Sequence, residues 1–225
     1  GNDDFPSEVV SIPKVGGFDN VSIEQVVALK PDLVLASNIH ISSVVPALRR
    51  LGIRVLVVDP QTVNQVLDAI VVVGDSVGRH EVAYALAAKL RKEIEAIRQR
   101  TAVMSHPRVF WELSPDLWTA GPGSYIDDLI RIAGGRNVAG NARAPWIQIS
   151  NESIVAENPQ IVILSDQGYG ASPETVAARP GWNAVSAVTS HRIVPVANED
   201  VVSRPGPRVL DALLWVARTI HPGDF

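Results

Sequence analysis

Two pairs of residues recur at matched positions in the two halves of the chain, and both pairs could take part in binding. Phe18 and Trp146 each lie four residues before a serine, and a glutamate, Glu24 or Glu152, follows each serine two positions later. A flat ligand placed between two such rings would bury a large apolar area. The glutamates either stabilise their own helices, by about 0.3–1 kcal/mol through the helix dipole, or form a matched pair of surface anions, one in each half.

These residues belong to a segment that occurs twice in the chain. Residues 22–36 (SIEQVVALKPDLVLA) align without a gap with residues 150–164 (SNESIVAENPQIVIL). A duplicated segment predicts two similar lobes. Two lobes that face each other form a cleft in which a ligand can lie, and we expect the aromatic pair to line it.

Each copy of the repeat predicts a short helix followed by a buried strand. Ser22 and Ser150 precede apolar-periodic runs and therefore act as helix N-caps. Pro31 and Pro159 end these helices because proline lacks the backbone N–H that a helix requires. The continuous apolar run that follows each proline is typical of a buried parallel strand.

Composition narrows the classes of function. A net charge of −4 argues against a nucleic-acid partner. Because the chain has no cysteine, disulfides, thiolate metal sites and a cysteine nucleophile are excluded. No run reaches the roughly 18 apolar residues of a membrane span, and we expect any targeting segment to lie upstream or to have been removed.

Alternating helix and strand signals predict an α/β protein with parallel sheets. A helix that ends at Gly52, a strand at residues 54–58 and a helix that begins at Thr62 form a βαβ pattern. Residues 81–101 contain no Gly or Pro and predict one helix about 30 Å long. We therefore expect an N-terminal lobe at residues 1–78, a connecting helix at 79–103 and a C-terminal lobe at 104–225.

Motifs along nearly the whole chain resemble one known family, the helical-backbone (class III) substrate-binding proteins of ABC importers. These proteins carry cobalamin, haem and iron-siderophores, and the cobalamin-binding members are the most similar. The motifs are VGGF at residues 15–18, the Ser-x-Glu helix start followed by LKPDLV, TAGPGS at 119–124, AGGRNV at 133–138, PW at 145–146 and RPGPR at 204–208.

The resemblance implies both a fold and a function. Two Rossmann-like αβ lobes would be joined by one long backbone helix, with the ligand in the cleft between the lobes. The protein would be the substrate-binding component of an importer and not an enzyme. It would act as a monomer, free in a periplasm or tethered by an upstream lipid anchor outside the cell membrane. Glu24 and Glu152 would dock into basic pockets on the two permease subunits, because paired charges fix orientation and raise the association rate.

Six residues match ligand-contacting positions of this family. Two aromatic residues would sandwich the ligand, a third would add a contact, and an acid and a base would hydrogen bond to ligand side groups. At the sixth position a serine replaces an aromatic residue. In this order the residues are Phe18 and Trp146, Trp118, Asp200 and Arg204, and Ser37.

Packing in the core is the alternative for each aromatic residue, since that is the usual position of Trp and Phe. We expect Trp182 and Trp215 to be structural. Trp111 is expected in the core as well, although together with Glu112 it could line the rim of the ligand pocket.

The chain departs from the family pattern at its N-terminus. Family members begin with a strand, a helix and a second strand before the segment that matches residues 2–6, and this sequence lacks them. Either these elements have been trimmed or the lobe is built differently. In the second case the N-terminal sheet would have an exposed edge.

Two other functions use the same or a related scaffold. A haem or ferric-siderophore carrier would need an axial Tyr or His, for which Tyr169 and His40 are the candidates, or an arginine-rich cleft. A chelatase-like metalloenzyme would need clustered His and carboxylate ligands, but the five histidines are scattered without HExxH spacing. We therefore predict no catalytic residue, no metal site and no cofactor beyond the transported ligand, which is expected to be cobalamin before haem or a siderophore.

Overall fold

The computed structural model describes residues 5–17 and 19–225, which form two compact units. The first unit is Gly1–Asp59 and the second is Pro60–Phe225. The sequence pattern places the end of the first lobe at residue 78, so the two divisions differ by one helix. That helix belongs to the second unit because it packs along the long helix that follows it.

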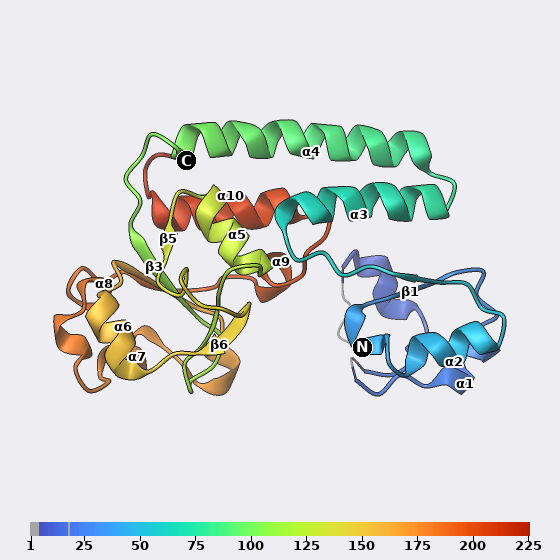
Figure 1. Ribbon diagram of the computed structural model, residues 1–225, viewed down its shortest axis with the longest axis horizontal. Coiled ribbons are helices and arrows are strands. Elements are labelled where there is room, and N and C mark those ends of the chain that lie inside the picture. Colours follow the sequence, from blue (N-terminus) through green and yellow to red (C-terminus); the bar gives the residue numbers. More distant parts are fainter. Residues whose placement is uncertain (1–4, 18) are drawn as a thin grey trace. The chain divides into compact units, whose positions relative to one another are not determined.

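The N-terminal unit contains a two-stranded parallel sheet and two helices (Figure 1). In this sheet Val34 lies opposite Val55. The two helices pack against each other. With η for a 3-10 helix, the elements are η1 (Ser7–Ser11), α1 (Ile23–Ala28), β1 (Val34–Ala36), η2 (Asn38–His40), α2 (Val44–Arg50) and β2 (Val55–Val57).

Few apolar side chains of this unit are buried. Among its described residues these are Val26, Ala36, Val45 and Leu48. Leu35, at the centre of β1, is 52% exposed, so the prediction of a fully buried strand is wrong for this copy of the repeat. Parallel strands are normally covered on both faces. Among the described residues, Ala36 of β1 is buried whereas Leu35, which points to the opposite face, is exposed.

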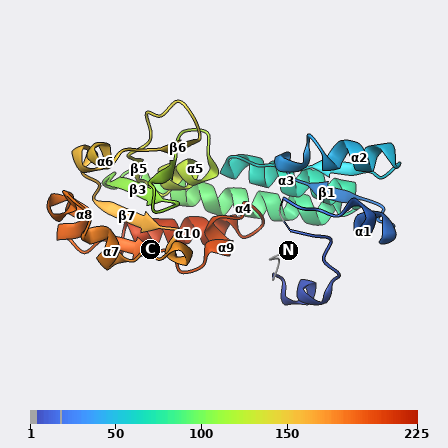
Figure 2. The ribbon, with the colours of Figure 1, turned by 90° about the horizontal axis from the view of Figure 1, so that it is seen from below.

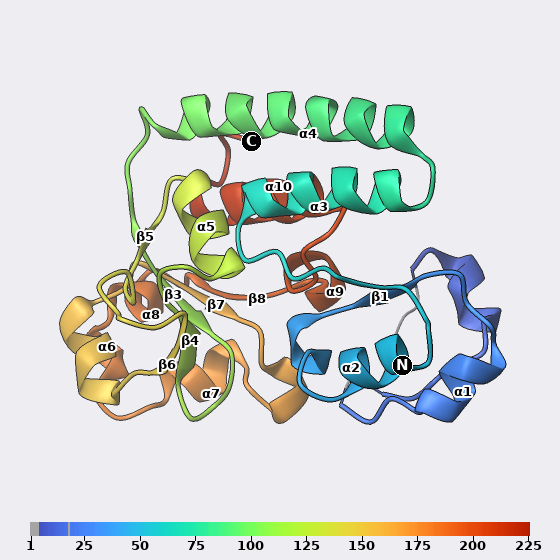
Figure 3. The same ribbon diagram turned by 45° about the vertical axis from the view of Figure 1, so that its right-hand side comes forward.

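The second unit begins with two long helices, α3 (Val63–Ser76) and α4 (His80–Thr101). The predicted long helix is confirmed by α4. Figures 1 and 3 both show α3 and α4 side by side and antiparallel. Gly74 permits their close approach, because a Cβ atom at this position would collide with the side chain of Ala83.

A four-stranded parallel sheet forms the centre of the second unit, with the strand order β5-β3-β7-β8. This sheet confirms the predicted α/β class with parallel strands. A separate antiparallel ribbon, β4 with β6, was not predicted. The elements are β3 (Arg108–Glu112), β4 (Trp118–Ala120), α5 (Tyr125–Ile132), β5 (Arg136–Asn137), β6 (Trp146–Gln148), α6 (Asn151–Glu157), β7 (Ile161–Leu164), η3 (Gln167–Tyr169), α7 (Pro173–Ala177), η4 (Trp182–Ala184), α8 (Ser186–Thr189), β8 (Ile193–Pro195), α9 (Glu199–Val202) and α10 (Val209–Ile220).

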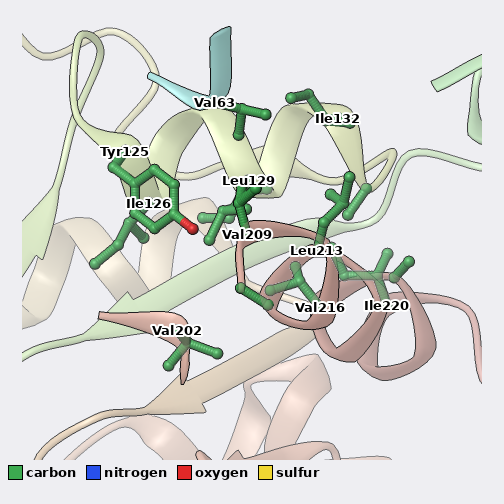
Figure 4. Close-up of a cluster of buried hydrophobic side chains, with 14 of the residues drawn as sticks. Val63, Tyr125, Ile126, Leu129, Ile132, Val202, Val209, Leu213, Val216 and Ile220 are labelled. Carbon is green, nitrogen blue, oxygen red and sulfur yellow. The ribbon is translucent and has the colours of Figure 1, made fainter. Parts of the chain in front are cut away.

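Both faces of this sheet are buried, each in its own apolar core. Successive side chains of a strand point to opposite faces. Val109 and Trp111 of β3 therefore join the core formed with α3, α4, α5 and α10, whereas Phe110 joins the core formed with α6, α7 and α8. Leu129 of α5 lies against Val209 of α10 in the first core (Figure 4). Figure 2 shows α10 next to α4, which it contacts.

The repeated segment has the same local structure in both units. Ser22 caps α1 and Ser150 caps α6, and each hydroxyl accepts a hydrogen bond from the backbone N–H three residues later, at 3.3 and 3.1 Å. Each helix is followed by a left-handed residue, Lys30 with φ 47° and Asn158 with φ 48°. The chain therefore turns one residue before the proline that the sequence pattern marks as the end of the helix.

Asn158→Ala is expected to lower the free energy of unfolding by about 2 kcal/mol. The left-handed conformation costs alanine about 1–2 kcal/mol, and the substitution removes the 2.7 Å hydrogen bond that Asn158 Oδ1 accepts from the Ser186 N–H. Urea unfolding measures the change. Lys30→Gly, at the equivalent position, should be neutral or should stabilise by up to about 1 kcal/mol. A clear loss of stability in Lys30→Gly would contradict the left-handed turn.

Candidate functional site

Parallel strands bring several segments of the second unit to one edge of its sheet. β3, β7 and β8 end at Glu112, Leu164 and Pro195, so the segments that follow them all start at this carboxyl edge. Ligands of open α/β sheets bind outside the carboxyl ends of the strands. The candidate site is therefore built from the ribbon that follows β3, the η3 segment that follows β7 and the α9 segment that follows β8.

The ribbon of β4 and β6 presents two of the predicted ligand residues on one face. Trp118 lies opposite Gln148, and Ala120 lies opposite Trp146. Opposed residues share a face, and so do alternate residues of one strand, so the two indole rings project from the same side as diagonal neighbours. Trp118 is 42% exposed and Trp146 is 44% exposed. The rings therefore form an apolar surface against which a large flat molecule can pack.

Hydrogen bonds fix this ribbon to the sheet. The Leu113 N–H, just after β3, donates to the Trp118 carbonyl at 2.9 Å and so ties the start of β4 to the end of β3. The buried Asn137 side chain, from the edge strand β5, donates to the Ala120 carbonyl at 2.7 Å. The backbone that carries the indoles is thus held in place before any ligand arrives.

The α9 segment places the predicted acid and base at the same edge. Arg204 Nη2 lies 2.5 Å from Asp200 Oδ1, so the two residues form an ion pair with each other. Arg208 also donates to the Asp200 carbonyl at 3.2 Å. Both members of the pair are partly exposed. A polar ligand group can reach them, but it must compete with the ion pair that is already present.

A buried ion pair lies beneath the carboxyl edge. Glu112 is completely buried, and its two carboxylate oxygens accept hydrogen bonds from Arg179 at 2.6 and 2.7 Å. Arg179 also lies over the ring of Trp182, 5.1 Å from its centroid. Asp166, just after β7, is 1% exposed, and burial together with the nearby Glu112 raises the pKa of Asp166 to about 7.

Sequence reasoning missed two members of this buried group, Asp166 and Arg179. It expected Trp111 in the core and gave the pocket rim, together with Glu112, as the alternative; both residues are completely buried, which supports the core position of Trp111. The available signal was a glutamate at the end of the apolar run VFW, because a buried carboxylate requires a partner. The sequence does not reveal that the partner is Arg179, which lies 67 residues further along the chain.

The remaining predicted ligand residues belong to the N-terminal unit. Ser37 follows β1 and is half-buried, and its hydroxyl lies 3.3 Å from Nδ1 of His40. Phe18 lies outside the described residues. The structure thus places Trp118, Trp146, Asp200 and Arg204 at one sheet edge, and it leaves the contribution of the N-terminal unit as a prediction.

The two glutamates predicted to dock onto the permease occupy equivalent positions. Glu24 and Glu152 each lie in the first turn of a serine-capped helix, α1 or α6, and both are exposed. Within residues 5–17 and 19–225, neither carboxylate is part of a recorded ion pair. Both charges are therefore available to a partner.

Other candidate chemistry has less support in the described part of the chain. Its His, Asp and Glu residues include no group of three or more that could hold a metal ion. Tyr169 of η3 is 76% exposed at the carboxyl edge. A depression of about 810 Å³ near β5, lined by Arg131, Arg136 and Glu157 among others, contains none of the predicted ligand residues.

Half-exposed indoles and a charged pair at the carboxyl edge of a parallel sheet are features of a ligand-binding α/β protein. The chain belongs to the periplasmic binding protein family, whose sequence profile matches residues 2–198. This match confirms the family resemblance that the motifs indicate.

Two relatives of known sequence are similar to this chain over most of its length. The chain is 33% identical over 233 residues to an uncharacterized ABC transporter substrate-binding lipoprotein of Bacillus subtilis, with 100% of this chain and 72% of the relative covered. It is 32% identical over 209 residues to the vitamin B12-binding protein of Salmonella typhi, with 92% of this chain and 76% of the relative covered.

Solved structures show the same fold. The periplasmic vitamin B12-binding protein of Vibrio cholerae matches with a TM-score of 0.79 and 25% identity, over 96% of this chain and 84% of the other. A periplasmic heme-binding protein in complex with two hemes matches with a TM-score of 0.85 and 26% identity, over the same shares of the two chains.

These comparisons define the general role of the protein. It is a substrate-binding protein of an ABC transporter, it is not an enzyme, and its partners are permease subunits. No helix within the described residues is long and apolar enough to cross a membrane.

Arg179→Met is expected to lower the free energy of unfolding by about 3–5 kcal/mol, because the Glu112 anion would stay buried without its partner. Urea unfolding measures this loss. The double variant Glu112→Gln with Arg179→Met removes both charges and should recover much of it. Arg91→Met breaks the exposed pair with Asp68 and should cost less than about 1 kcal/mol. If Arg179→Met and Arg91→Met lowered the free energy of unfolding equally, the result would contradict a buried pair between Glu112 and Arg179.

Proposed function

We propose that this protein binds cobalamin and delivers it to the permease of an ABC importer. The corrinoid packs against Trp118 and Trp146 at the carboxyl edge of the second unit. Asp200 and Arg204 exchange their mutual ion pair for hydrogen bonds to its amide side groups. Phe18 and Ser37 contact the same ligand in this proposal.

The observation that carries this proposal is the pair of half-exposed indoles on one face of the β4–β6 ribbon. A corrin ring is broad and flat, with apolar faces and a polar periphery of amides. Two aromatic rings fit its face, and the guanidinium fork of Arg204 fits an amide at its periphery. The similarity to two vitamin B12-binding proteins favours the same ligand class.

Glu24 and Glu152 are proposed to orient the protein on the permease. They have equivalent places in a duplicated segment, and both are exposed at the start of a capped helix. A pseudo-symmetric pair of anions suits a permease with two similar subunits and basic pockets. Such pairs accelerate association and fix orientation more than they add affinity. We place this docking event on the outer side of the cell membrane, with the protein either free in a periplasm or held by a lipid anchor.

Haem is the second candidate ligand, because one observation specifically favours it. Tyr169 lies on η3 at the carboxyl edge with 76% of its surface exposed, so its phenol oxygen is available as an axial iron ligand. The match to a heme-binding protein with a TM-score of 0.85 is consistent with this alternative. A ferric siderophore would use the same edge.

Calorimetry with cyanocobalamin is expected to show saturable binding with quenching of tryptophan fluorescence. Trp118→Ala and Trp146→Ala should each weaken binding by about 10-fold to 100-fold, because each removes a large apolar contact. Trp215→Phe is the matched control, since Trp215 packs against the core and should leave the affinity unchanged.

No heat and no quenching at micromolar cyanocobalamin would exclude a cobalamin carrier. A haem carrier would instead shift the haem absorption spectrum on mixing, and Tyr169→Phe would abolish this shift. The two ligands are therefore distinguished with one set of variants.

Reversal of both docking charges, Glu24→Lys with Glu152→Lys, is expected to abolish uptake by cells that express the cognate permease. Ligand affinity should not change, because neither residue is among the proposed ligand contacts. Glu81→Lys reverses an exposed acid in the first turn of α4 and should leave uptake intact. Normal uptake by the double variant would rule out these glutamates as the docking residues.

A further inference from the structure

Gln148 lies on the face of the β4–β6 ribbon that carries the two half-exposed indoles. It is directly opposite Trp118, and it follows Trp146 by two residues in β6. Opposed residues of an antiparallel pair have Cβ atoms about 5 Å apart, and alternate residues of one strand lie about 7 Å apart on the same face. Gln148 is itself exposed. Its amide group is therefore next to both rings, where a ligand that packs on them must meet it.

The orientation of this amide is fixed by Asp116, in the loop between β3 and β4. Gln148 Nε2 donates to the Asp116 carbonyl at 2.8 Å and to its carboxylate Oδ2 at 3.3 Å. Both partners are oxygens that accept hydrogen bonds, so the nitrogen end of the amide must face them. The Ser114 hydroxyl donates to Oδ1, the other carboxylate oxygen of Asp116, and so holds this side chain in place. Gln148 would lose both contacts if its amide turned over.

The fixed orientation leaves the oxygen end of the amide to the ligand. Within residues 5–17 and 19–225, no N–H or O–H group donates to Gln148 Oε1, whereas the amide nitrogen has two acceptors on Asp116. An amide oxygen has two lone pairs with which it accepts hydrogen bonds. The indole face thus presents a pre-oriented acceptor, with the negative charge of Asp116 behind it.

We propose that Gln148, oriented by Asp116, is a specificity-determining residue of the ligand site. It selects flat ligands that place an N–H donor, such as a primary amide, against the ribbon, and it rejects an ionised carboxylate at the same point. This inference rests on the proposed function, because it concerns a ligand that is seated on Trp118 and Trp146. It adds the chemical class of the ligand group that lies beside the two rings.

The selection follows from what each ligand group offers to an acceptor. A primary amide donates an N–H to Gln148 Oε1, and the negative charge of Asp116 favours the positive end of this N–H dipole. An ionised carboxylate has no hydrogen to donate. At the same point it would set oxygen against oxygen and would lose hydration without compensation, which is costly. The ribbon therefore matches an amide and opposes a carboxylate.

This selection separates the two candidate ligands. The periphery of a corrinoid carries neutral amides, so a corrinoid supplies the donor when one of these side chains lies against Gln148. Haem carries propionate groups, which are ionised at neutral pH and only accept hydrogen bonds. Haem would have to turn its propionates away from the ribbon. The pair of Gln148 and Asp116 therefore favours the corrinoid.

The ion pair on the α9 segment does not cancel this selection. Arg204 can bind a ligand carboxylate, but it follows α9 and is already paired with Asp200. The strand residues on the indole face of the ribbon include no cation, because they are Trp118, Ala120, Trp146 and Gln148. The rejection therefore applies to the ligand group that meets the ribbon and not to the whole periphery of the ligand.

The isomeric monocarboxylic acids of cyanocobalamin test the selection, because each isomer replaces one peripheral amide by a carboxylate and leaves the flat ring unchanged. Calorimetry of the wild-type protein should find at least one isomer that binds about 10-fold more weakly than cyanocobalamin, since a hydrogen bond is lost and a carboxylate is left unpaired. Gln148→Leu should weaken cyanocobalamin binding by about 3-fold to 10-fold. The same variant should narrow the gap between cyanocobalamin and that isomer by at least about 3-fold.

Asp116→Asn separates the charge behind the amide from the orientation of the amide. The backbone carbonyl of residue 116 would still accept from Gln148 Nε2, so the affinity for cyanocobalamin should change by less than about 2-fold. Loss of the negative charge should narrow the gap between cyanocobalamin and the rejected acid severalfold. Gln99→Leu is the matched control and should leave every affinity unchanged. Gln99 also donates its Nε2 to an acid, Glu95, at 3.1 Å, but it lies on α4 and not on the ribbon.

The outcomes distinguish this inference from the proposed function. If the wild-type protein does not bind cyanocobalamin, both are overturned. If it binds cyanocobalamin and all the acids equally well, or if Gln148→Leu leaves the gap unchanged, the selection by Gln148 is overturned and the cobalamin carrier is not. If Gln148→Leu fails to fold, Asp116→Asn decides the question, because an unchanged gap in that variant would overturn the role of the pair.

Discussion

The parallel alignment of β3, β7 and β8 is the constraint on which the candidate site depends. Because these strands run in the same direction, the ribbon, the η3 segment and α9 all start at one edge of the sheet. Residues far apart in the sequence, such as Trp118 and Asp200, therefore lie at the same edge. The two apolar cores on the faces of the sheet hold the strands in this alignment, and the hydrogen bonds of Asn137 and Leu113 attach the ribbon to it.

Directly beneath this edge, charged side chains are buried next to apolar ones. Val109, Phe110 and Trp111 of β3 are buried, yet the strand ends in a buried carboxylate that is paired with Arg179. Asp166 adds a second carboxylate that no described donor satisfies. Groups of this kind are rarely kept for stability alone, because an apolar replacement of similar volume often serves as well.

The duplicated segment and the spacing of apolar residues were sufficient to predict the α/β class, the capped helices α1 and α6, and the length of α4. They were not sufficient where structure depends on partners distant in the chain. The β4–β6 ribbon consists of two three-residue strands separated by α5 and β5, so no local pattern reveals their pairing. The partner of Glu112 is likewise distant, and the exposure of Leu35 depends on what covers β1. Lys30 adopts the left-handed conformation, so the chain turns one residue before Pro31. The sequence pattern had instead attributed the end of this helix to Pro31.

The central claim is that the carboxyl edge of the second unit is the ligand-binding surface. Hydrogen–deuterium exchange with and without saturating cyanocobalamin tests it most directly, because protection reports where the ligand lies. We predict slower exchange in residues 113–121, 145–149, 166–170 and 198–204, which form this edge, and no change in residues 134–136 at the depression near β5. Protection confined to that depression, with the ribbon and α9 unchanged, would contradict the account.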